Sequence, residues 1–286
     1  PGLKALQDGE WIHKSAGASN KWPPPKYVNW LCGKECPVVH CGGSRTLPHE
    51  ALAFVEEGCP CIFRDFKVFP AASERWSFGY LATHLTDALF SVFTSNTGNY
   101  SYWYGKPNSA GFAFSSPTQR EVMTFQDFLK RQHGDEGEHE AQRRSFYLQD
   151  PLYYDKTGQE LGLRREIMSS EMARDWEQDL SWEALRQVRQ AGDYSRLSTS
   201  TLFCSGRGAY SRPHYDQSAN LYLQVRGAKR WLLFAPEDGP LLYPYPRGHP
   251  LDRKSRVNFE APQLDEFPAA AELRGRGVLA VLRPGD

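Results

Sequence analysis

The stretch Ser211-Arg212-Pro213-His214-Tyr215-Asp216 carries the most informative pattern in this chain of 286 residues. On a β-strand, residues two apart point to the same face, so His214 and Asp216 are able to meet one metal ion together. They supply two-thirds of a 2-His-1-carboxylate triad, which leaves open positions on Fe(II) for a co-substrate and O2. The spacing alone is weak evidence, because chance supplies His-x-Asp pairs readily in a chain of this length.

The residues around this pair favour β structure. Short strands are predicted over 201–204, 219–225 and 230–234, with glycine-bearing turns between them. If the strand from His214 runs on unbroken, Asn220, Tyr222 and Gln224 share its face and apolar residues occupy the other face. A polar inner face is expected for a barrel that encloses a site.

The chain before residue 197 favours helices interspersed with a few strands. Helices are predicted over 48–57, 76–88, 124–132 and 171–190, and strands over 59–66, 89–94, 100–104 and 146–148. Thr124-Phe125-Gln126-Asp127 resembles a capping box, and Gly192 is the stop signal of the last helix. Together these patterns predict an α+β fold: a β-barrel or double-sheet jelly roll with a helical flank.

The sequence predicts an irregular N-terminal arm followed by one main domain. Residues 1–45 form an irregular N-terminal arm that includes Trp22-Pro23-Pro24-Pro25, a sequence typical of extended backbone. Residues 46–286 form the main domain.

Composition excludes several classes of function. The 34 basic and 34 acidic residues cancel, which disfavours a nucleic-acid or anionic-membrane partner, and no apolar run is long enough to cross a membrane. Six cysteines do not indicate a disulfide scaffold. Cys32, Cys36, His40 and Cys41 have spacings that match no common zinc-ligand pair. A reduced cytoplasmic or nuclear setting is therefore expected.

Lys229 opens the strand that follows the His-x-Asp stretch. A buried ammonium requires an anionic partner, and the far carboxylate of a metal-chelating dicarboxylate supplies one. Ser211 and Tyr147 offer hydroxyl donors to the same carboxylate. The alternative is that Lys229 is an exposed residue beside a hairpin turn, as most lysines are.

The same part of the chain also resembles a known protein family. Residues 197–268 resemble JmjC/cupin-type 2-oxoglutarate oxygenases, in particular the asparaginyl hydroxylase that inhibits hypoxia-inducible factor. The motifs that carry the resemblance are His214-Tyr215-Asp216, Gly227-Ala228-Lys229-Arg230, Leu242-Tyr243-Pro244-Tyr245-Pro246 and His249-Pro250-Leu251-Asp252-Arg253. Weaker similarity extends back over most of residues 46–286.

The resemblance implies a double-stranded β-helix fold, a site and a reaction. His214 and Asp216 bind Fe(II), and Lys229 pairs with 2-oxoglutarate, helped by Tyr147, Ser211 and Asn220. Side chains that approach the protein substrate are Tyr102, Gln149, Arg253 and Lys254. The implied reaction hydroxylates a protein side chain while 2-oxoglutarate becomes succinate and CO2.

Two departures from the family pattern matter. Lys254 stands where the family has a glutamine, and because lysine donates without accepting, asparagine as the target is in doubt. The second histidine ligand is expected beyond Asp286, since Arg283-Pro284-Gly285-Asp286 matches the segment that leads to it. The C-terminal part of the domain, with helices that dimerise the family, is expected beyond the same point.

Several alternatives stay open from the sequence. Ankyrin-repeat proteins are one implied substrate class, and a homodimer is implied for a longer chain. The rival functions are a JmjC-type lysine demethylase or hydroxylase, a tRNA-base hydroxylase, and a non-catalytic cupin-like binding module. His249 is the nearest later histidine, but Pro250 places it in irregular backbone, where an oriented ligand is not expected.

Overall fold

The computed structural model describes residues 30–101, 111–116, 118–133, 144–156, 159–259 and 261–286. The predicted strand over 100–104 lies mostly outside this part of the chain, and so does Tyr102.

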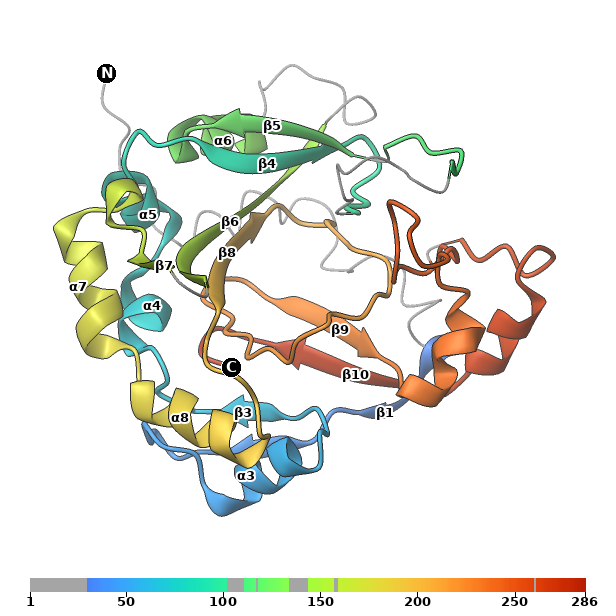
Figure 1. Ribbon diagram of the computed structural model, residues 1–286, viewed down its shortest axis with the longest axis horizontal. Coiled ribbons are helices and arrows are strands. Elements are labelled where there is room, and N and C mark those ends of the chain that lie inside the picture. The colour runs from blue at the N-terminus through green and yellow to red at the C-terminus, as the bar shows by residue number, and fades with distance from the viewer. Residues whose placement is uncertain (1–29, 102–110, 117, 134–143, 157–158, 260) are drawn as a thin grey trace.

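The larger sheet is antiparallel and collects most of the middle of the chain (Figure 1). Its strands are β4 (Phe90–Ser95), β5 (Gln119–Met123), β6 (Ser145–Lys156), β7 (Gln159–Leu163) and β8 (Thr199–Ser205). The order is β5-β4-β6-β7, and β8 also pairs with β6. One face follows the period of two: Phe90, Val92 and Leu148 are fully buried in the main core. The strands predicted over 89–94, 146–148 and 201–204 are thereby confirmed.

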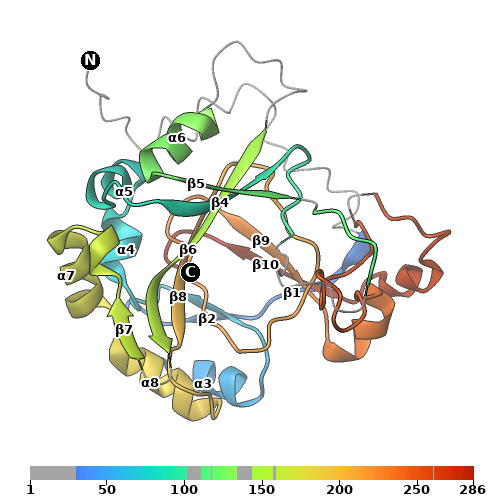
Figure 2. The same cartoon turned by 45° about the horizontal axis from the view of Figure 1, so that its top comes forward.

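The second sheet joins the two ends of the described chain. Its order is β1 (Cys32–Glu35), β10 (Gly277–Leu282) and β9 (Lys229–Leu233). A separate two-stranded sheet pairs β2 (Val38–His40) in parallel with β3 (Ile62–Arg64). Figures 1 and 2 both show β9 and β10 across the interior from β4 and β5.

The irregular arm expected over 1–45 needs correction where it can be followed. Residues 1–29 lie outside the described chain, but 32–35 and 38–40 are strands, and β1 is an integral member of the second sheet. Cys32 pairs with Gly277, which is remote in sequence. Local composition holds no trace of such a partner, so the sequence pattern missed the strand.

The strand predicted over 219–225 is wrong as well. This segment has no regular strand, although Gln224 exchanges backbone hydrogen bonds with the end of the chain: its N–H donates to Asp286 (2.9 Å), and Gly285 donates to its carbonyl (2.8 Å). A segment of alternating polar and apolar residues becomes a strand only where a neighbouring strand runs along its length. Among the described residues, this segment is hydrogen-bonded to such a neighbour only at Gln224.

Helices cover the core face of the larger sheet (Figure 1). They are α3 (His49–Glu56), α4 (Pro70–Arg75), α5 (Phe78–His84), α6 (Phe125–His133), α7 (Ser170–Asp179) and α8 (Trp182–Ala191), with 3-10 turns at Arg165–Ile167, Pro236–Leu242 and Pro268–Leu273. The predicted cap of α6 is confirmed, since Asp127 N–H donates to Thr124 Oγ1 at 3.1 Å.

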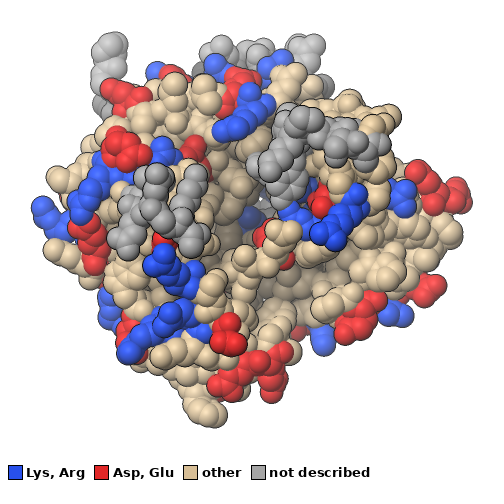
Figure 3. Space-filling model, in the orientation of Figure 1, with Lys and Arg blue, Asp and Glu red and all other residues tan. Residues whose placement is uncertain are grey.

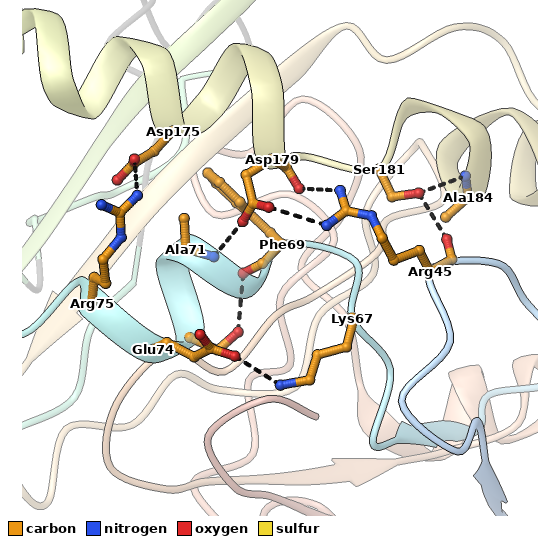
Figure 4. Close-up of polar contacts among 11 residues, drawn as sticks. Arg45, Lys67, Phe69, Ala71, Glu74, Arg75, Asp175, Asp179, Ser181 and Ala184 are labelled. Atoms are coloured by element: carbon orange, nitrogen blue, oxygen red, sulfur yellow. Dashed lines mark hydrogen bonds and ion pairs between the residues drawn. The ribbon is translucent and has the colours of Figure 1, made fainter.

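The single helix predicted over 171–190 is two helices. The chain turns at Leu180, and Ser181 starts α8 by accepting a hydrogen bond from Ala184 N–H (Figure 4). Asp179, the last residue of α7, accepts from Ala71 N–H at the start of α4 and from Arg45 Nη1 at 3.1 Å. These capping bonds to other segments outweigh continued helix, which the apolar periodicity alone favoured.

Within the described ranges, the helices are too short or too polar for a membrane-spanning segment.

Candidate active site

His214 and Asp216 lie in the segment that joins β8 to β9. The side chains of His214 and Asp216 are exposed, and His214 forms a single antiparallel bridge with Lys254. The His214 Nδ1 lies 2.8 Å from the carbonyl oxygen of Arg212. Because a carbonyl only accepts, Nδ1 carries the proton and the Nε2 lone pair is left for a ligand. A bond of this kind orients metal-binding histidines.

Lys254 lies against this pair. It is 8% exposed, and burial together with the neighbouring Arg253 lowers its pKa, while the carboxylates of Asp216 and Asp252 oppose the shift. The ammonium of Lys254, which replaces the glutamine of the resembled family, thus interacts electrostatically with Asp216, the proposed metal ligand.

The described residues supply two metal ligands here and not three. No group of three His, Cys, Asp or Glu side chains in the described ranges is placed to hold an ion. His249 does not complete the set: it is buried and stacked 4.3 Å from the ring of Tyr245, and its Nδ1 accepts from Leu251 N–H at 2.9 Å. Its Nε2 therefore carries the proton and lacks a free lone pair. The histidine expected beyond Asp286 stays a prediction.

Lys229 is delivered by the turn before β9. Gly227 takes a positive φ of 70°, which glycine adopts without strain. The guanidinium of Arg226 donates to the carbonyls of Ser73 and Glu74 (the latter at 3.0 Å) and so fixes the turn against α4.

The ammonium of Lys229 sits among three aromatic rings. Its Nζ lies 4.7 Å from the ring centroid of Trp231, 4.8 Å from that of Tyr222 and 5.7 Å from that of Phe203. We call these three residues the aromatic cage. Ring faces attract a cation but do not neutralise it.

Burial lowers the pKa of Lys229 to about 8. Among the described residues, no carboxylate lies within ion-pair distance of its Nζ. The alternative of an exposed lysine is wrong, because the side chain is largely enclosed. A desolvated cation without an anion fits a site for an anionic ligand.

Tyr147 shares the inner face with the cage. It faces Phe203 with ring centroids 6.1 Å apart, and burial raises its pKa, so its hydroxyl stays protonated and able to donate. Ser211 and Asn220, in contrast, are exposed, and neither bonds to Lys229 or Tyr147 in the described structure. The structure thus joins Tyr147 to Lys229 and leaves the other two predicted residues in the adjoining segment.

The predicted substrate-side residues lie on two sides of this centre. Gln149 is paired with Phe203 in the β6–β8 ladder, two residues from Tyr147 and on the same face. Arg253 adopts a left-handed backbone with φ of 66°, and its Nη1 donates to the carbonyl of Tyr215 at 3.3 Å. Figure 3 shows this face hollowed near its centre, over the region bounded in Figure 1 by β8, β9 and the segment between them.

Sequence analysis missed the cage as a unit. Trp231 lies two residues after Lys229 on β9, so their shared face was visible in the sequence. Phe203 comes from another sheet and Tyr222 from an irregular segment. The sequence pattern placed Tyr222 on the polar inner face, but no local signal brought either ring to Lys229.

The sequence of this chain matches a known protein family. The profile of the cupin-like domain matches residues 49–286. The chain belongs to the cupin-like domain family. The jelly-roll prediction is thereby confirmed for this cupin-like chain, with its two facing sheets and flanking helices. The narrower likeness to the asparaginyl hydroxylase stays a prediction.

Relatives of this cupin-like chain have diverse names. HSPB1-associated protein 1 of Rattus norvegicus is 39% identical over 91 residues, which are 30% of this chain and 18% of that protein. Lysine-specific demethylase JMJ31 of Arabidopsis thaliana is 32% identical over 94 residues, 33% of this chain and 17% of that protein. tRNA wybutosine-synthesizing protein 5 of Danio rerio is 28% identical over 172 residues, 58% and 45% respectively. The aligned stretches span less than half of each relative.

Proposed function

We propose that this protein is an Fe(II)- and 2-oxoglutarate-dependent oxygenase that hydroxylates a side chain of a protein substrate. The observation that carries the proposal is the ammonium of Lys229, enclosed by the aromatic cage on the inner face that also holds Tyr147, with no carboxylate partner in the described chain. Membership of the cupin-like family supports the general oxygenase assignment.

Each residue has a distinct task in this proposal. His214 contributes the lone pair of Nε2, and Asp216 contributes a carboxylate oxygen. Bound iron supplies the oxidising chemistry that couples decarboxylation of 2-oxoglutarate to hydroxylation of a C–H bond. Lys229 pairs with the distal carboxylate, and Tyr147 donates a hydrogen bond to it. The cage keeps water from this ion pair, which strengthens it.

Lys254 and Gln149 are the residues proposed to contact the target side chain. The ammonium of Lys254 only donates hydrogen bonds and so favours a carbonyl or a carboxylate, whereas the amide of Gln149 both donates and accepts. We therefore place an acidic or carbonyl-bearing side chain beside Lys254, and asparagine is one member of that class.

The test is turnover by the full-length protein. Incubation with Fe(II), 2-oxoglutarate and O2 is expected to produce succinate. Asp216→Ala is expected to abolish succinate formation, because two protein ligands hold iron poorly. His249→Ala is expected to retain it. Equal loss in the two variants would overturn the ligand assignment.

Absence of succinate in the presence of bound 2-oxoglutarate would favour a non-catalytic binding module. Products distinguish the remaining rivals. Formaldehyde release from methylated histone peptides would support a lysine demethylase. Modification of transfer RNA would support a tRNA-base hydroxylase, and one Danio rerio relative is named a tRNA wybutosine-synthesizing protein.

A further inference from the structure

A second cavity opens on the same inner face, beyond the aromatic cage. Its volume is about 320 Å³, and it is lined by residues of β4, β5, β6 and β8 and by Arg164, which follows β7. Figure 2 shows these four strands side by side. Gln149 lines this cavity and is paired with Phe203, a member of the cage, so the cavity adjoins the candidate active site along the β6–β8 ladder.

A β-bulge shapes the far wall. The β6–β8 register shifts between Pro151 and Tyr153, so Leu152 and Tyr153 both pack on the main core. The shift turns Tyr154 to the cavity face, where an unbroken strand would direct it to the core. The guanidinium of Arg164 then lies 5.9 Å from the ring of Tyr154.

The base of the cavity holds one guanidinium, that of Arg164, between two carboxylates. Asp150 is 8% exposed and accepts hydrogen bonds from Ser91 N–H at 2.7 Å and from Arg164 Nη1 at 2.6 Å. Arg164 also donates to the carbonyl of Pro151 and, through Nε, to Glu166 at 2.9 Å. The two carboxylates outnumber the single guanidinium of Arg164 by one negative charge.

Arg120 is linked to this network only through Ser91. It lines the cavity from β5, and its Nη2 donates to Ser91 Oγ at 2.7 Å. Within the described chain, its guanidinium meets no carboxylate. The cavity therefore holds one guanidinium with no direct carboxylate partner among the described residues, beside neutral hydrogen-bonding groups from Ser91, Gln149 and Thr201.

We propose that this cavity receives an aspartate or glutamate side chain of the polypeptide substrate, with Arg120 as its ion-pair partner. The volume is at the lower end of the roughly 300–1,000 Å³ typical of small-molecule sites, which suits a side chain better than a second cofactor. A guanidinium binds a carboxylate through two parallel hydrogen bonds. The acidic residue is a recognition element separate from the target residue, which lies at His214 and Asp216.

A polypeptide fits this cavity better than RNA. A nucleic acid brings one negative charge per phosphate, and proteins neutralise several of them to bind it. Here a single arginine lacks a carboxylate partner, and one guanidinium matches one carboxylate rather than a run of phosphates.

The proposal rests on the proposed protein-hydroxylase function, and its test measures binding without turnover. A library of 13-residue peptides, each with one position fixed as Asp, Glu, Asn, Gln, Lys or Arg, is bound to the full-length protein. The native protein is expected to favour Asp or Glu at one position by about ten-fold over the amides, as charge-assisted hydrogen bonds predict.

Charge-swap variants assign that preference to a residue. Arg120→Lys is expected to keep the preference in weaker form, and Arg120→Glu to reverse it toward Lys or Arg. Arg274→Glu, which changes an exposed arginine before β10, is the matched control and is expected to change nothing. Arg120→Gln serves if the charge reversal impairs folding, and is expected to abolish the preference.

The outcomes separate the two proposals. No acidic preference in the native protein, or the same preference in Arg120→Glu or Arg120→Gln, would overturn the cavity assignment. RNA binding that falls with Arg120→Glu, without peptide selection, would overturn it in favour of a nucleic-acid partner. Arg120-dependent peptide selection without succinate formation would overturn the oxygenase function and leave the acidic-peptide assignment standing.

Discussion

Arg64 and Asp286 form a two-point ion pair that ties β3 to the residue after the Pro-Gly turn that follows β10. Arg64 Nε and Nη2 each lie 3.0 Å from a different carboxylate oxygen of Asp286. The Asp286 side chain is 6% exposed and also accepts from Arg283 N–H. Because the Asp286 carbonyl binds Gln224 N–H, the same residue anchors the segment that carries Tyr222 of the aromatic cage.

Arg64→Ala is expected to destabilise the fold by about 3 kcal/mol, because it leaves a buried carboxylate without its countercharge. The measurement is urea unfolding. Lys67→Ala is the control: its ion pair with Glu74 is exposed on both sides, and the expected loss is below about 0.5 kcal/mol. Equal losses would mean that the Asp286 carboxylate is solvated after all.

Lys229→Met is expected to weaken 2-oxoglutarate binding by about 10- to 100-fold, the loss of one charge-assisted bond. Isothermal titration calorimetry in the absence of O2 gives the affinity directly. Lys67→Met, an equivalent change at an exposed lysine, is expected to have no effect. Unchanged affinity in Lys229→Met would remove the central support of the proposed function.

The affinity is also expected to depend on pH. Lys229 loses its proton as the pH rises through about 8, where burial has lowered its pKa. Binding of a dicarboxylate should therefore be constant below about pH 7 and weaken up to about ten-fold per unit above pH 8. Lys229→Arg keeps its charge throughout and should lack this decline. A decline of the same size in both proteins would assign it to another group.

Stability should follow the opposite course. The pKa of Lys229 is lower in the folded protein than in the unfolded chain, so between pH 8 and about 10.5 the unfolded chain binds more protons, and folding gains free energy as the pH rises. Relative to Lys229→Met, the unfolding free energy of the native protein should rise by up to about 3 kcal/mol across this window. Urea unfolding at pH 7.5 and 10 measures the difference. A flat difference would show that the lysine is already solvated or paired.

Asp175 supports the helical layer behind the larger sheet. Its carboxylate accepts from Arg75, from Trp76 Nε1 at 3.0 Å and from the hydroxyl of Tyr80 at 2.8 Å (Figure 4 shows the Arg75 contact). Asp175→Asn is expected to cost about 3 kcal/mol, because the amide has lost its charge and turns a donor toward donors. Tyr80→Phe, which removes one hydrogen bond, should cost about 1 kcal/mol in the same unfolding experiment. A smaller loss in Asp175→Asn than in Tyr80→Phe would contradict this ranking.

Elements with a strong local signal were predictable. The capping sequence at Thr124 and the stop at Gly192 both mark real helix ends, because a cap is formed by residues a few positions apart. The break between α7 and α8 was not predictable in this way. It depends on Asp179 binding Ala71 and on Ser181 donating to the carbonyl of Arg45, contacts between distant segments.

The candidate site likewise contains features that a local signal predicted and features that depend on distant contacts. His214, Asp216 and Lys229 were identifiable because spacing and motif resemblance lie within one stretch of chain. The tautomer of His214 was not, because it depends on where the carbonyl of Arg212 points after folding.

The sequence by itself determined the cupin-like family, the short strands β8 and β9 and the residues proposed to hold an anion and a metal. The tertiary structure alone decided that Lys229 is enclosed with no carboxylate partner among the described residues, that β1 completes the second sheet, and that Arg120 lines a cavity beside Gln149. Burial and pairing depend on which distant segments exclude water from a group. A local pattern specifies the chemistry of a side chain, and packing sets its charge state and its partners.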